Sequence, residues 1–277
     1  MIEYPVVNGQ VVLVDFDESI LSKGQVVKSG AASLIEGRRT RQSLLKRAVM
    51  GQNDVAARNA GIVLEHLRTR EGESTILIVG GGSVNEGARE LYLAESVRVI
   101  SFDVYASPNT DFVADAHAIP LKDGSVDAVW IQAVLEHVLT PATVVDEIWR
   151  VLRPEGLVYA ETPFLQPVHE AAYDFTRFTE NGHRWLFRHF EMIDSGVVRG
   201  PGTVLFQILR YALGAAVGNR WLGSRLTLPF FWVRFLDRLA DRAHASDTAS
   251  SVFFIGRRSE KALRPQDMAA LFRGVQK

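Results

Sequence analysis

The sequence TILIVGGGSVNEG, residues 75–87, opens a segment in which short apolar runs alternate with helical stretches. The apolar runs that follow are VRVISFD (97–103), DFVA (111–114), VDAVWIQ (126–132) and GLVYAE (156–161). Continuous apolar runs of this length are typical of strands that are buried on both faces. Strands that alternate with helices predict an α/β protein whose parallel sheet is covered on both sides.

Helices are predicted between these strands and before them. The residue pattern is helical over 84–95 and 140–152, and from about Arg38 to Arg70. Thr140 is placed as an N-cap and Pro141 as the first helical residue, a position that tolerates its missing N–H. Each of these helices is therefore expected to cover one face of the sheet.

The flanking segments give weaker signals. Residues 4–16 predict a hairpin around Asn8-Gly9, a pair that accepts positive φ at both centres of a type I′ turn. After the last of the five strands we expect helices over 179–190, 203–217 and 229–242, strands over 191–198 and 251–256, and a solvent-exposed tail over 259–277.

Composition excludes several classes of protein. The 277 residues are 47% hydrophobic and 23% charged, which is a globular composition. Lys and Arg minus Asp and Glu gives 31 − 32 = −1, so no overall basic charge favours nucleic acid. With no cysteine there is no disulfide, thiolate zinc site or cysteine nucleophile, and no metal site is predicted. The sequence shows neither a signal peptide nor a transmembrane run, so a cytoplasmic location is expected.

Three features fall at the edge of the predicted sheet where α/β proteins bind ligands, beyond the carboxyl ends of the strands. Gly80, Gly81 and Gly82 follow the first strand, and glycines allow backbone N–H groups to approach a ligand closely. Asp103 ends the second strand, where a carboxylate can accept both hydroxyls of a ribose. Asp115 follows the third strand, where it can accept an adenine amine. Together they predict a nucleoside site.

The glycine spacing indicates which kind of nucleoside ligand is disfavoured. A dinucleotide fingerprint needs G-x-G-x-x-G, and the sixth position counted from Gly80 is Asn85. The next glycine, Gly87, comes two residues late. This counts against a nicotinamide-dependent oxidoreductase and leaves a nucleoside without phosphates acceptable.

Residues 74–164 closely resemble the core of a class I S-adenosylmethionine-dependent methyltransferase of the type 11 branch. The most specific part is DAHAIPLKDGSVDAV, VLEHV and EIWRVLRPEGL, within residues 115–157. The resemblance implies a Rossmann-like, doubly wound, mostly parallel seven-stranded sheet, with a helical insertion at about 200–245 before the last strand. The methyltransferase domain is then expected over 38–258, after an N-terminal extension (1–37) and before a tail (259–277).

The opening YPVVNGQVVLV, residues 4–14, is similar to the last hairpin of a small Trm112-like module. The zinc-binding cysteines of that module are absent here. The expected N-terminal extension is therefore a degenerate hairpin of this kind.

The resemblance also implies roles for individual residues. Gly80 and Gly82 border the methionine part of S-adenosylmethionine, Asp103 holds the ribose, Asp115 with Ala116 reads the adenine, and Gln132 faces the methyl group. The full set implied for the cofactor is Gly80, Gly81, Gly82, Asp103, Val104, Asp115, Ala116 and Gln132. Two positions depart from the family pattern, Ile78 in place of an acid and Ser83-Val84 in place of the last glycine. A catalytically degenerate binding or regulatory protein therefore stays open as an alternative.

Candidate catalytic side chains follow the fourth and fifth strands. A hydroxyl acceptor needs a base near neutral pH, and His137 follows the fourth strand at the cofactor edge. A capping or pocket-shaping histidine is the alternative. His169 and Asp174 lie where the acceptor should enter, and Arg177 is suited to an anionic group. The alternative there is a lid tied down by an Asp174–Arg177 pair.

Residues 199–242 have a composition of their own. They hold seven arginines, two aspartates and no lysine, a local charge of 7 − 2 = +5, together with Phe230, Phe231, Trp232 and Phe235. This favours a lid over an apolar acceptor or a surface on an anionic membrane. The alternative is a helical cap packed on the sheet or on a second copy in a homodimer.

The sequence thus predicts a methyltransferase that uses S-adenosylmethionine and acts on a small-molecule acceptor. We expect transfer to oxygen, with a sugar or a lipid-linked, apolar molecule as the acceptor.

Overall fold

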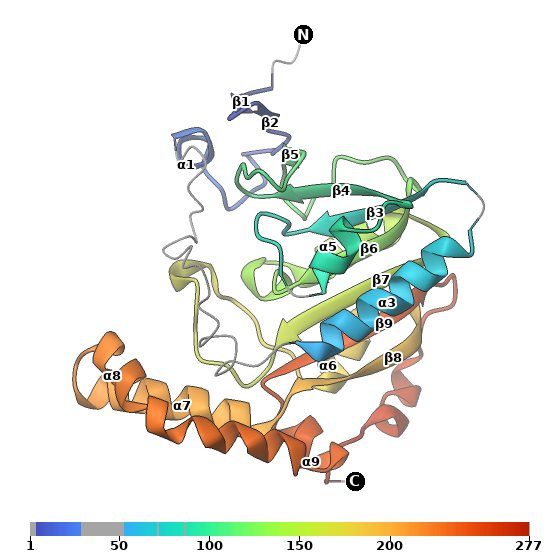
Figure 1. Cartoon of the computed structure of the whole chain (residues 1–277). Coiled ribbons are helices and arrows are strands. Elements are labelled where there is room, and N and C mark those ends of the chain that lie inside the picture. Colours follow the sequence, from blue (N-terminus) through green and yellow to red (C-terminus); the bar gives the residue numbers. More distant parts are fainter. Residues whose placement is uncertain (1–3, 29–52, 71, 86, 277) are drawn as a thin grey trace.

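The computed structural model describes residues 4–28, 53–70, 72–85 and 87–276. Its centre is a seven-stranded sheet with the order β5-β4-β3-β6-β7-β9-β8 (Figure 1). The strands are β3 (Ser74–Val79), β4 (Val97–Asp103), β5 (Phe112–Val113), β6 (Val126–Gln132), β7 (Leu152–Pro163), β8 (Phe190–Arg199) and β9 (Ser251–Arg258). The first five strands in this order run parallel, and β9 is antiparallel to both β7 and β8. The expected mostly parallel, doubly wound sheet is confirmed.

Helices cover both faces of the sheet. On one face, α3 (Asp54–Arg68) and α4 (Ala88–Tyr92) pack against Ile76, Ile78 and Trp130. On the other, α5 (Pro141–Val151) and α6 (Glu180–Leu186) enclose a second apolar cluster. Residues of β3 and β6 alternate between these two clusters because successive side chains of a strand point to opposite faces. The two layers therefore fix the sheet between them.

Two of the predicted helices are shorter in the structure. The expected helix over 84–95 is reduced to α4, because Gly87 has φ 89° and a helix begins only after it. The helix expected from Arg38 begins, in the described part, at Asp54, where the side chain of Asn53 accepts a hydrogen bond from the Ala56 N–H. Residues 38–52 of that prediction lie outside the described residues.

The N-terminal segment forms the predicted hairpin. β1 (Val6–Val7) pairs with β2 (Gln10–Val11), and Asn8 and Gly9 have φ 50° and 82°, as a type I′ turn requires. A bridge between Val12 and Val113 attaches it beside β5, the edge of the sheet, and α1 (Lys23–Lys28) follows. The similarity of this hairpin to a Trm112-like module stays a prediction.

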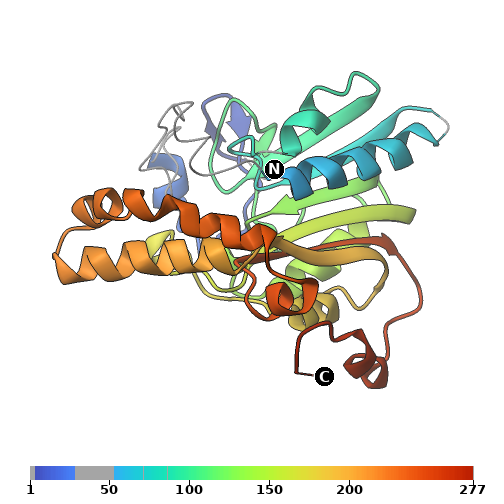
Figure 2. The same cartoon turned by 60° about the horizontal axis from the view of Figure 1, so that its bottom comes forward.

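A helical hairpin projects from the body of the protein (Figures 1 and 2). We use this term for residues 201–238, which contain α7 (Pro201–Ala216), α8 (Arg220–Leu226) and the 3₁₀ helix η3 (Leu228–Arg238). The single helix expected over 229–242 is wrong, because the chain turns after η3 and a new helix, α9 (Arg242–Asp247), begins at the Asp241 N-cap.

The helical hairpin packs on itself through small residues. A Cβ atom on Gly223 would lie 2.4 Å from the Cα of Gly214, and one on Gly202 would lie 2.3 Å from the carbonyl oxygen of Val233. Of α7, only Gly202, Thr203 and Phe206 are buried. The expected packing of these apolar faces on the sheet is therefore not found in the described residues. None of the helices in the described ranges combines the length and apolar character that crossing a bilayer needs.

The C-terminal segment is largely exposed, as expected for 259–277, and it is attached to the body of the protein. It contains two short 3₁₀ helices, η4 (Pro265–Asp267) and η5 (Ala269–Leu271). Arg273 donates to the carbonyl oxygen of Ser195 at 2.7 Å, and the Val275 N–H donates to Asp247 at 2.8 Å. These hydrogen bonds hold the segment against β8 and α9.

Candidate functional site

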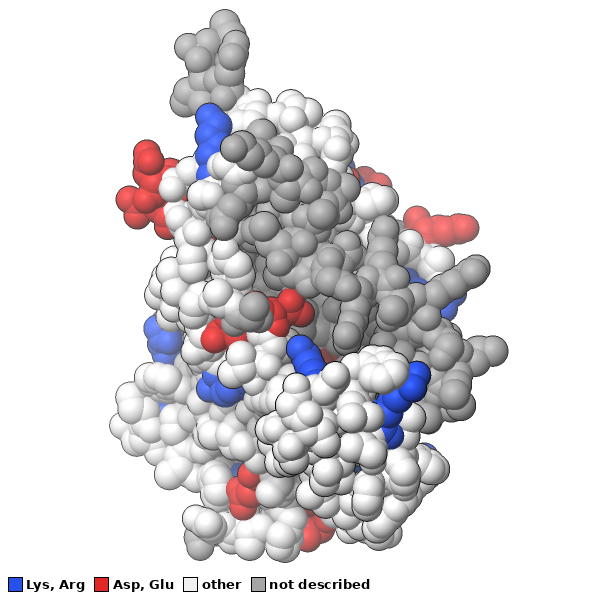
Figure 3. Space-filling model, turned by 90° about the vertical axis from the view of Figure 1, so that its left-hand side faces the viewer, with Lys and Arg blue, Asp and Glu red and all other residues white. Residues whose placement is uncertain are grey.

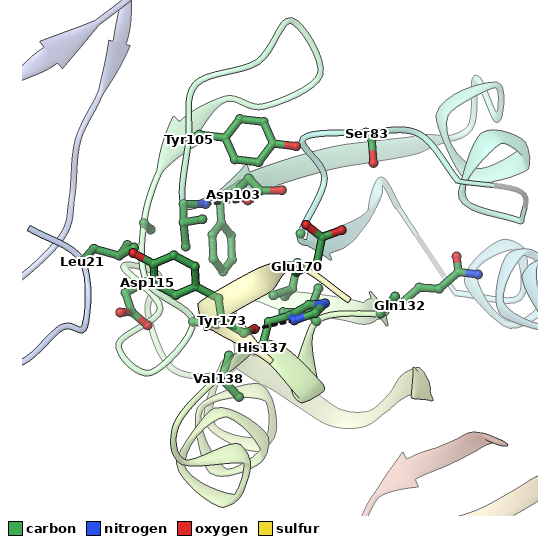
Figure 4. Close-up of a pocket in the computed structure, with 18 of the residues that line it drawn as sticks. Leu21, Ser83, Asp103, Tyr105, Asp115, Gln132, His137, Val138, Glu170 and Tyr173 are labelled. Carbon is green, nitrogen blue, oxygen red and sulfur yellow. Dashed lines mark hydrogen bonds between the residues drawn. The ribbon is translucent and has the colours of Figure 1, made fainter. Parts of the chain in front are cut away.

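A cavity of about 300 Å³ lies at the carboxyl ends of β3, β4, β5 and β6 (Figure 4). We call it the strand-end cavity. Of the residues predicted for the cofactor and for catalysis, those that line it are Gly80, Asp103, Val104, Asp115, Ala116, Gln132, His137 and His169. The chain folds so that residues from four strands and two loops meet at one concave surface, where open α/β sheets bind ligands.

The glycines after β3 hold the loop close to β4. A Cβ on Gly81 would lie 1.8 Å from the Ser101 Oγ, and one on Gly82 would lie 2.2 Å from the Tyr105 hydroxyl. Gly80 has φ 77°, a backbone conformation that residues with a side chain rarely adopt. Of the three glycines, it is the one that lines the cavity. Gly81 and Gly82 do not line it and pack against Ser101 and Tyr105. That these two glycines border the ligand stays a prediction.

Asp103 lies at the end of β4 beside the glycine loop. One carboxylate oxygen accepts the Gly82 N–H at 2.8 Å and the other accepts the Val104 N–H at 2.7 Å. Burial raises the pKa of Asp103 to about 6, against the opposing effect of these two hydrogen bonds. Each oxygen keeps a lone pair, so the carboxylate can still accept ligand hydroxyls.

Asp115 is more occupied than the sequence indicates. One of its oxygens accepts the backbone N–H of His117 at 2.9 Å and lies 2.6 Å from His117 Nδ1, and the other accepts a hydrogen bond from the Ser19 hydroxyl. Burial acts to raise the pKa of Asp115, but these hydrogen bonds outweigh it and lower the pKa. Ile20 and Leu21, which follow Ser19, line the cavity. The N-terminal segment therefore forms one wall of this subsite.

Gln132 lines the cavity at the end of β6, and its side-chain amide is hydrogen-bonded to residues outside the cavity. The amide nitrogen donates to the Glu161 carboxylate at 3.0 Å, and the amide oxygen accepts the Trp130 indole N–H at 3.3 Å. Glu161 also accepts from Asn53 at 3.0 Å. This partly buried network fixes the side chain of Gln132 at the cavity wall. That Gln132 faces the methyl group stays a prediction.

His137 belongs to the short 3₁₀ helix η1 (Leu135–His137) that follows β6. Its Nδ1 lies 2.6 Å from the carbonyl oxygen of Tyr173 (Figure 4). Because a carbonyl only accepts hydrogen bonds, Nδ1 carries the proton and Nε2 is left for other chemistry. The ring of His169 packs against that of His137, with centroids 5.1 Å apart.

Asp174 and Arg177 pair with each other behind His169. Arg177 donates to Asp174 through two nitrogens, one of them at 2.6 Å, and Asp174 also accepts the His169 backbone N–H at 2.7 Å. Burial acts to raise the pKa of Asp174, but these hydrogen bonds outweigh it and lower the pKa to about 2. Neither side chain lines the cavity. Direct catalytic roles for Asp174 and Arg177 stay a prediction, and the Asp174–Arg177 pair expected in the alternative is present.

Several lining residues were not predicted. Tyr105, Glu170 and Tyr173 line the cavity, and Glu136 lies fully buried behind His137. For Glu136 no local pattern gives a signal, because the burial of an acid depends on the segments that pack against it. The others depend on loops whose paths only the folded chain defines.

Backbone conformation gives independent support for a functional site. The described non-glycine residues with positive φ are Asn8, Ala133, Glu155 and Glu170, and two of them, Ala133 (56°) and Glu170 (62°), line the cavity. Such conformations cost free energy and concentrate at sites where the surrounding structure enforces them.

Comparison with known proteins finds a similarity in the centre of the chain. Residues 80–160 match the model of a methyltransferase domain. An uncharacterised 37.1 kDa protein of transposon TN4556 from Streptomyces fradiae is 31% identical over 127 residues, which cover 41% of this chain and 37% of that protein. The chain therefore matches little more than a third of the length of that curated relative.

Two solved structures show similar folds. A phosphoethanolamine N-methyltransferase 2 of Haemonchus contortus overlaps with a TM-score of 0.47 at 14% identity, over 83% of this chain and 61% of that one. A 1,6-didemethyltoxoflavin-N1-methyltransferase of Burkholderia thailandensis overlaps with a TM-score of 0.45 at 16% identity, over 75% and 80%. Both structures contain S-adenosylhomocysteine. At this level of overlap, neither identifies a substrate for this chain.

Proposed function

We propose that this chain, whose residues 80–160 form a class I S-adenosylmethionine-dependent methyltransferase domain, methylates an oxygen atom of a small-molecule acceptor in the strand-end cavity. The observation that carries the proposal is the meeting of Gly80, Asp103, Asp115 and His137 at one cavity, at the carboxyl ends of neighbouring strands. A sugar or a lipid-linked molecule is the acceptor class that we favour.

The residues present fit an adenosine. Asp103 offers lone pairs to ribose hydroxyls, and the Ala116 N–H lies where a ring nitrogen of adenine would bind. Phe102, Val104, Ile20 and Leu21 supply apolar walls. Because the Ser19 hydroxyl donates to Asp115, the Asp115 carboxylate would accept hydrogen bonds both from the N-terminal segment and from an adenine amine. The cavity thus combines a carboxylate at the proposed ribose subsite, that of Asp103, with apolar side chains around it, as a nucleoside site requires.

The chemistry needs alignment more than activation of the donor. A bound S-adenosylmethionine supplies an electrophilic methyl group on a sulfonium, a good leaving group. The protein then has to hold the acceptor oxygen in line with that methyl group. His137, His169 and Glu170 line the end of the cavity that follows β6 and β7, and we assign them to the acceptor side. Asp174 and Arg177 are positioning residues there, because they hold the loop that carries His169.

We also propose that the helical hairpin docks on an anionic lipid surface. Trp221, Phe231 and Trp232 are 58%, 44% and 55% exposed, although aromatic residues of this size are usually buried. Figure 3 shows a largely uncharged face on this side of the molecule, with Lys and Arg side chains beside it. Exposed aromatic rings combined with a local charge of 5 − 1 = +4 over residues 201–238 match the chemistry of an anionic membrane interface.

Calorimetry with S-adenosylmethionine and S-adenosylhomocysteine tests the proposed enzyme. An active enzyme binds both ligands at the same cavity and converts S-adenosylmethionine to S-adenosylhomocysteine when an acceptor is present. A regulatory descendant that has lost turnover binds the ligands but forms no S-adenosylhomocysteine. Absence of binding to either ligand would contradict the proposal. Stabilisation of the fold by a nicotinamide dinucleotide in place of these ligands would indicate an oxidoreductase.

The expected domain limits, 1–37, 38–258 and 259–277, belong to the same proposal. Residues 200–245 are then an insertion that carries the docking surface, placed between β8 and β9 of one catalytic domain.

A further inference from the structure

Behind the acceptor end of the strand-end cavity lies a buried acid that faces two histidine rings. The side chain of Glu136 is completely buried, and within the described residues neither of its carboxylate oxygens makes a hydrogen bond. A carboxylate that loses water without gaining donors is costly, so such a group is retained only where something compensates for its charge.

Two histidines direct the same ring nitrogen at this carboxylate. Glu136 Oε1 lies 3.7 Å from His137 Nε2 and 3.8 Å from His169 Nε2. The three ligand atoms lie within 4.8 Å of one another. These separations exceed a hydrogen bond, so a shared proton does not bridge them.

The other nitrogen of each ring is oriented by a separate acceptor. His137 Nδ1 contacts the Tyr173 carbonyl at 2.6 Å, and His169 Nδ1 lies 3.3 Å from the Pro167 carbonyl and 3.5 Å from Asp174. His169 Nδ1 also lies 3.4 Å from a guanidinium nitrogen of Arg177, which donates. For His137 the arrangement leaves the Nε2 lone pair facing Glu136, and the Nε2 atom of His169 faces the same carboxylate. Metal-binding histidines show the same pattern, in which the ring nitrogen that does not bind the metal donates its N–H to a carbonyl or carboxylate and so fixes the orientation of the ring.

The two histidine–carboxylate separations fit a common cation. Ligand atoms at about 2.1 Å from one metal ion, at angles of about 110–130°, lie about 3.4–3.8 Å from each other. Two imidazoles and one carboxylate favour zinc, iron, cobalt or nickel over magnesium and calcium, which prefer sets of oxygen ligands.

We infer that Glu136, His137 and His169 form a binding site for a divalent transition-metal cation, which leaves a coordination position open toward the acceptor. The sequence alone predicts no metal here. His137 and His169 line the strand-end cavity while Glu136 lies behind them, so the cation is held at the cavity wall. Three protein ligands with one open position are typical of catalytic metal sites.

The role in catalysis rests on the proposed methyl transfer. An acceptor hydroxyl bound to the cation loses its proton to solvent more readily, because the cation stabilises the alkoxide. The oxygen lone pair then forms a bond to the methyl carbon, the carbon–sulfur bond breaks, and its electron pair stays on sulfur as the neutral thioether. The cation thereby replaces a histidine as the group that activates the acceptor.

Metal content measured by mass spectrometry tests the site without any acceptor. After chelation and equilibrium dialysis against Zn²⁺ or Co²⁺, the full-length protein is expected to retain about one equivalent per chain. Glu136→Gln and His169→Ala should each weaken retention at least tenfold, and His244→Ala should not, because His244 lies on α9 and pairs with Asp241.

Circular dichroism serves as the folding control. The metal content of a variant is compared with that of the wild type only if the variant shows the wild-type spectrum. The inference is overturned if folded wild-type protein retains no metal, or if folded Glu136→Gln retains as much as wild type. Calorimetry with S-adenosylhomocysteine separates the two proposals. Intact nucleoside binding without metal refutes the cation site alone, whereas metal binding without nucleoside binding refutes the proposed methyltransferase.

Discussion

The carboxylate of Asp103 accepts the backbone N–H of Gly82 at 2.8 Å, which joins the end of β4 to the loop that follows β3. The same carboxylate lines the strand-end cavity. The Asp103 side chain therefore fixes the shape of the glycine loop and also presents acceptors to a ligand. Substitutions at Asp103 and in the glycine loop should have separable effects on ligand binding and on stability.

Asp103→Asn should weaken the binding of S-adenosylmethionine by about 1–3 kcal/mol, the value of hydrogen bonds to a charged group. The amide keeps one acceptor and loses the charge, so ribose hydroxyls bind less strongly. Isothermal titration calorimetry measures the change. Asp123→Asn is the matched control, because Asp123 is exposed and pairs with Arg150 away from the cavity. Equal affinity in Asp103→Asn and wild type would mean that the ribose assignment is wrong.

The affinity for S-adenosylmethionine should fall at acidic pH. The pKa of Asp103 is raised by burial to about 6, so the ionised form that accepts two hydroxyls is lost as the pH falls through that value. If the ionised form alone binds, the dissociation constant rises about tenfold for each pH unit below the pKa. Calorimetry between pH 5 and 8 checks this, and Asp103→Asn should show no such dependence. A flat profile in the wild type would count against the role of Asp103.

Gly81→Ala should destabilise the protein. The new Cβ would lie 1.8 Å from the Ser101 Oγ, so β4 or the loop has to shift, and overpacking of this kind costs about 1–3 kcal/mol. Gly61→Ala is the control, since Gly61 is an exposed residue within α3 and its Cβ would meet nothing within 4 Å. That change should stabilise the protein by about 0.5–1 kcal/mol through helix propensity. Urea denaturation measures both, and a neutral Gly81→Ala would contradict the packing role.

The helical hairpin should bind vesicles that contain anionic lipid and leave neutral vesicles unbound. The double variant Trp221→Ser, Trp232→Ser should lower vesicle binding at least tenfold, because two exposed aromatic rings no longer enter the interface. Trp185→Ser is the control, since this partly exposed tryptophan lies on α6, outside the hairpin. Co-sedimentation provides the measurement. Concentration-dependent dimers that the double variant abolishes would instead identify the surface as a contact between two copies.

The buried strands could be predicted from the sequence nearly to the residue. Val97–Asp103 and Val126–Gln132 form β4 and β6 at their expected bounds, because each is an apolar run that ends in a polar residue at the sheet edge. The helix expected at 84–95 was too long because the conformation of Gly87 cannot be read from its neighbours. For the helical hairpin, the sequence left a lid, a membrane surface and a cap on the sheet or on a second copy open, because an amphipathic pattern does not reveal which partner covers it.

The ligand-binding edge was partly predictable for the same reason. Asp103, Asp115 and His137 follow strands, and parallel strands bring their carboxyl ends together. The carboxylate of Glu136 and the Ser19 contact of Asp115 were not predictable, because both depend on segments distant in sequence that pack against the strand ends. Burial of an acid is a tertiary property that no local pattern contains.

The most direct test of the nucleoside site is a crystal structure of the full-length protein grown with S-adenosylhomocysteine. The account predicts adenosine density in the strand-end cavity, with the ribose hydroxyls on Asp103 and the adenine beside Asp115 and Ala116. Density for the ligand at another surface, or none in a crystal grown at saturating ligand, would contradict it.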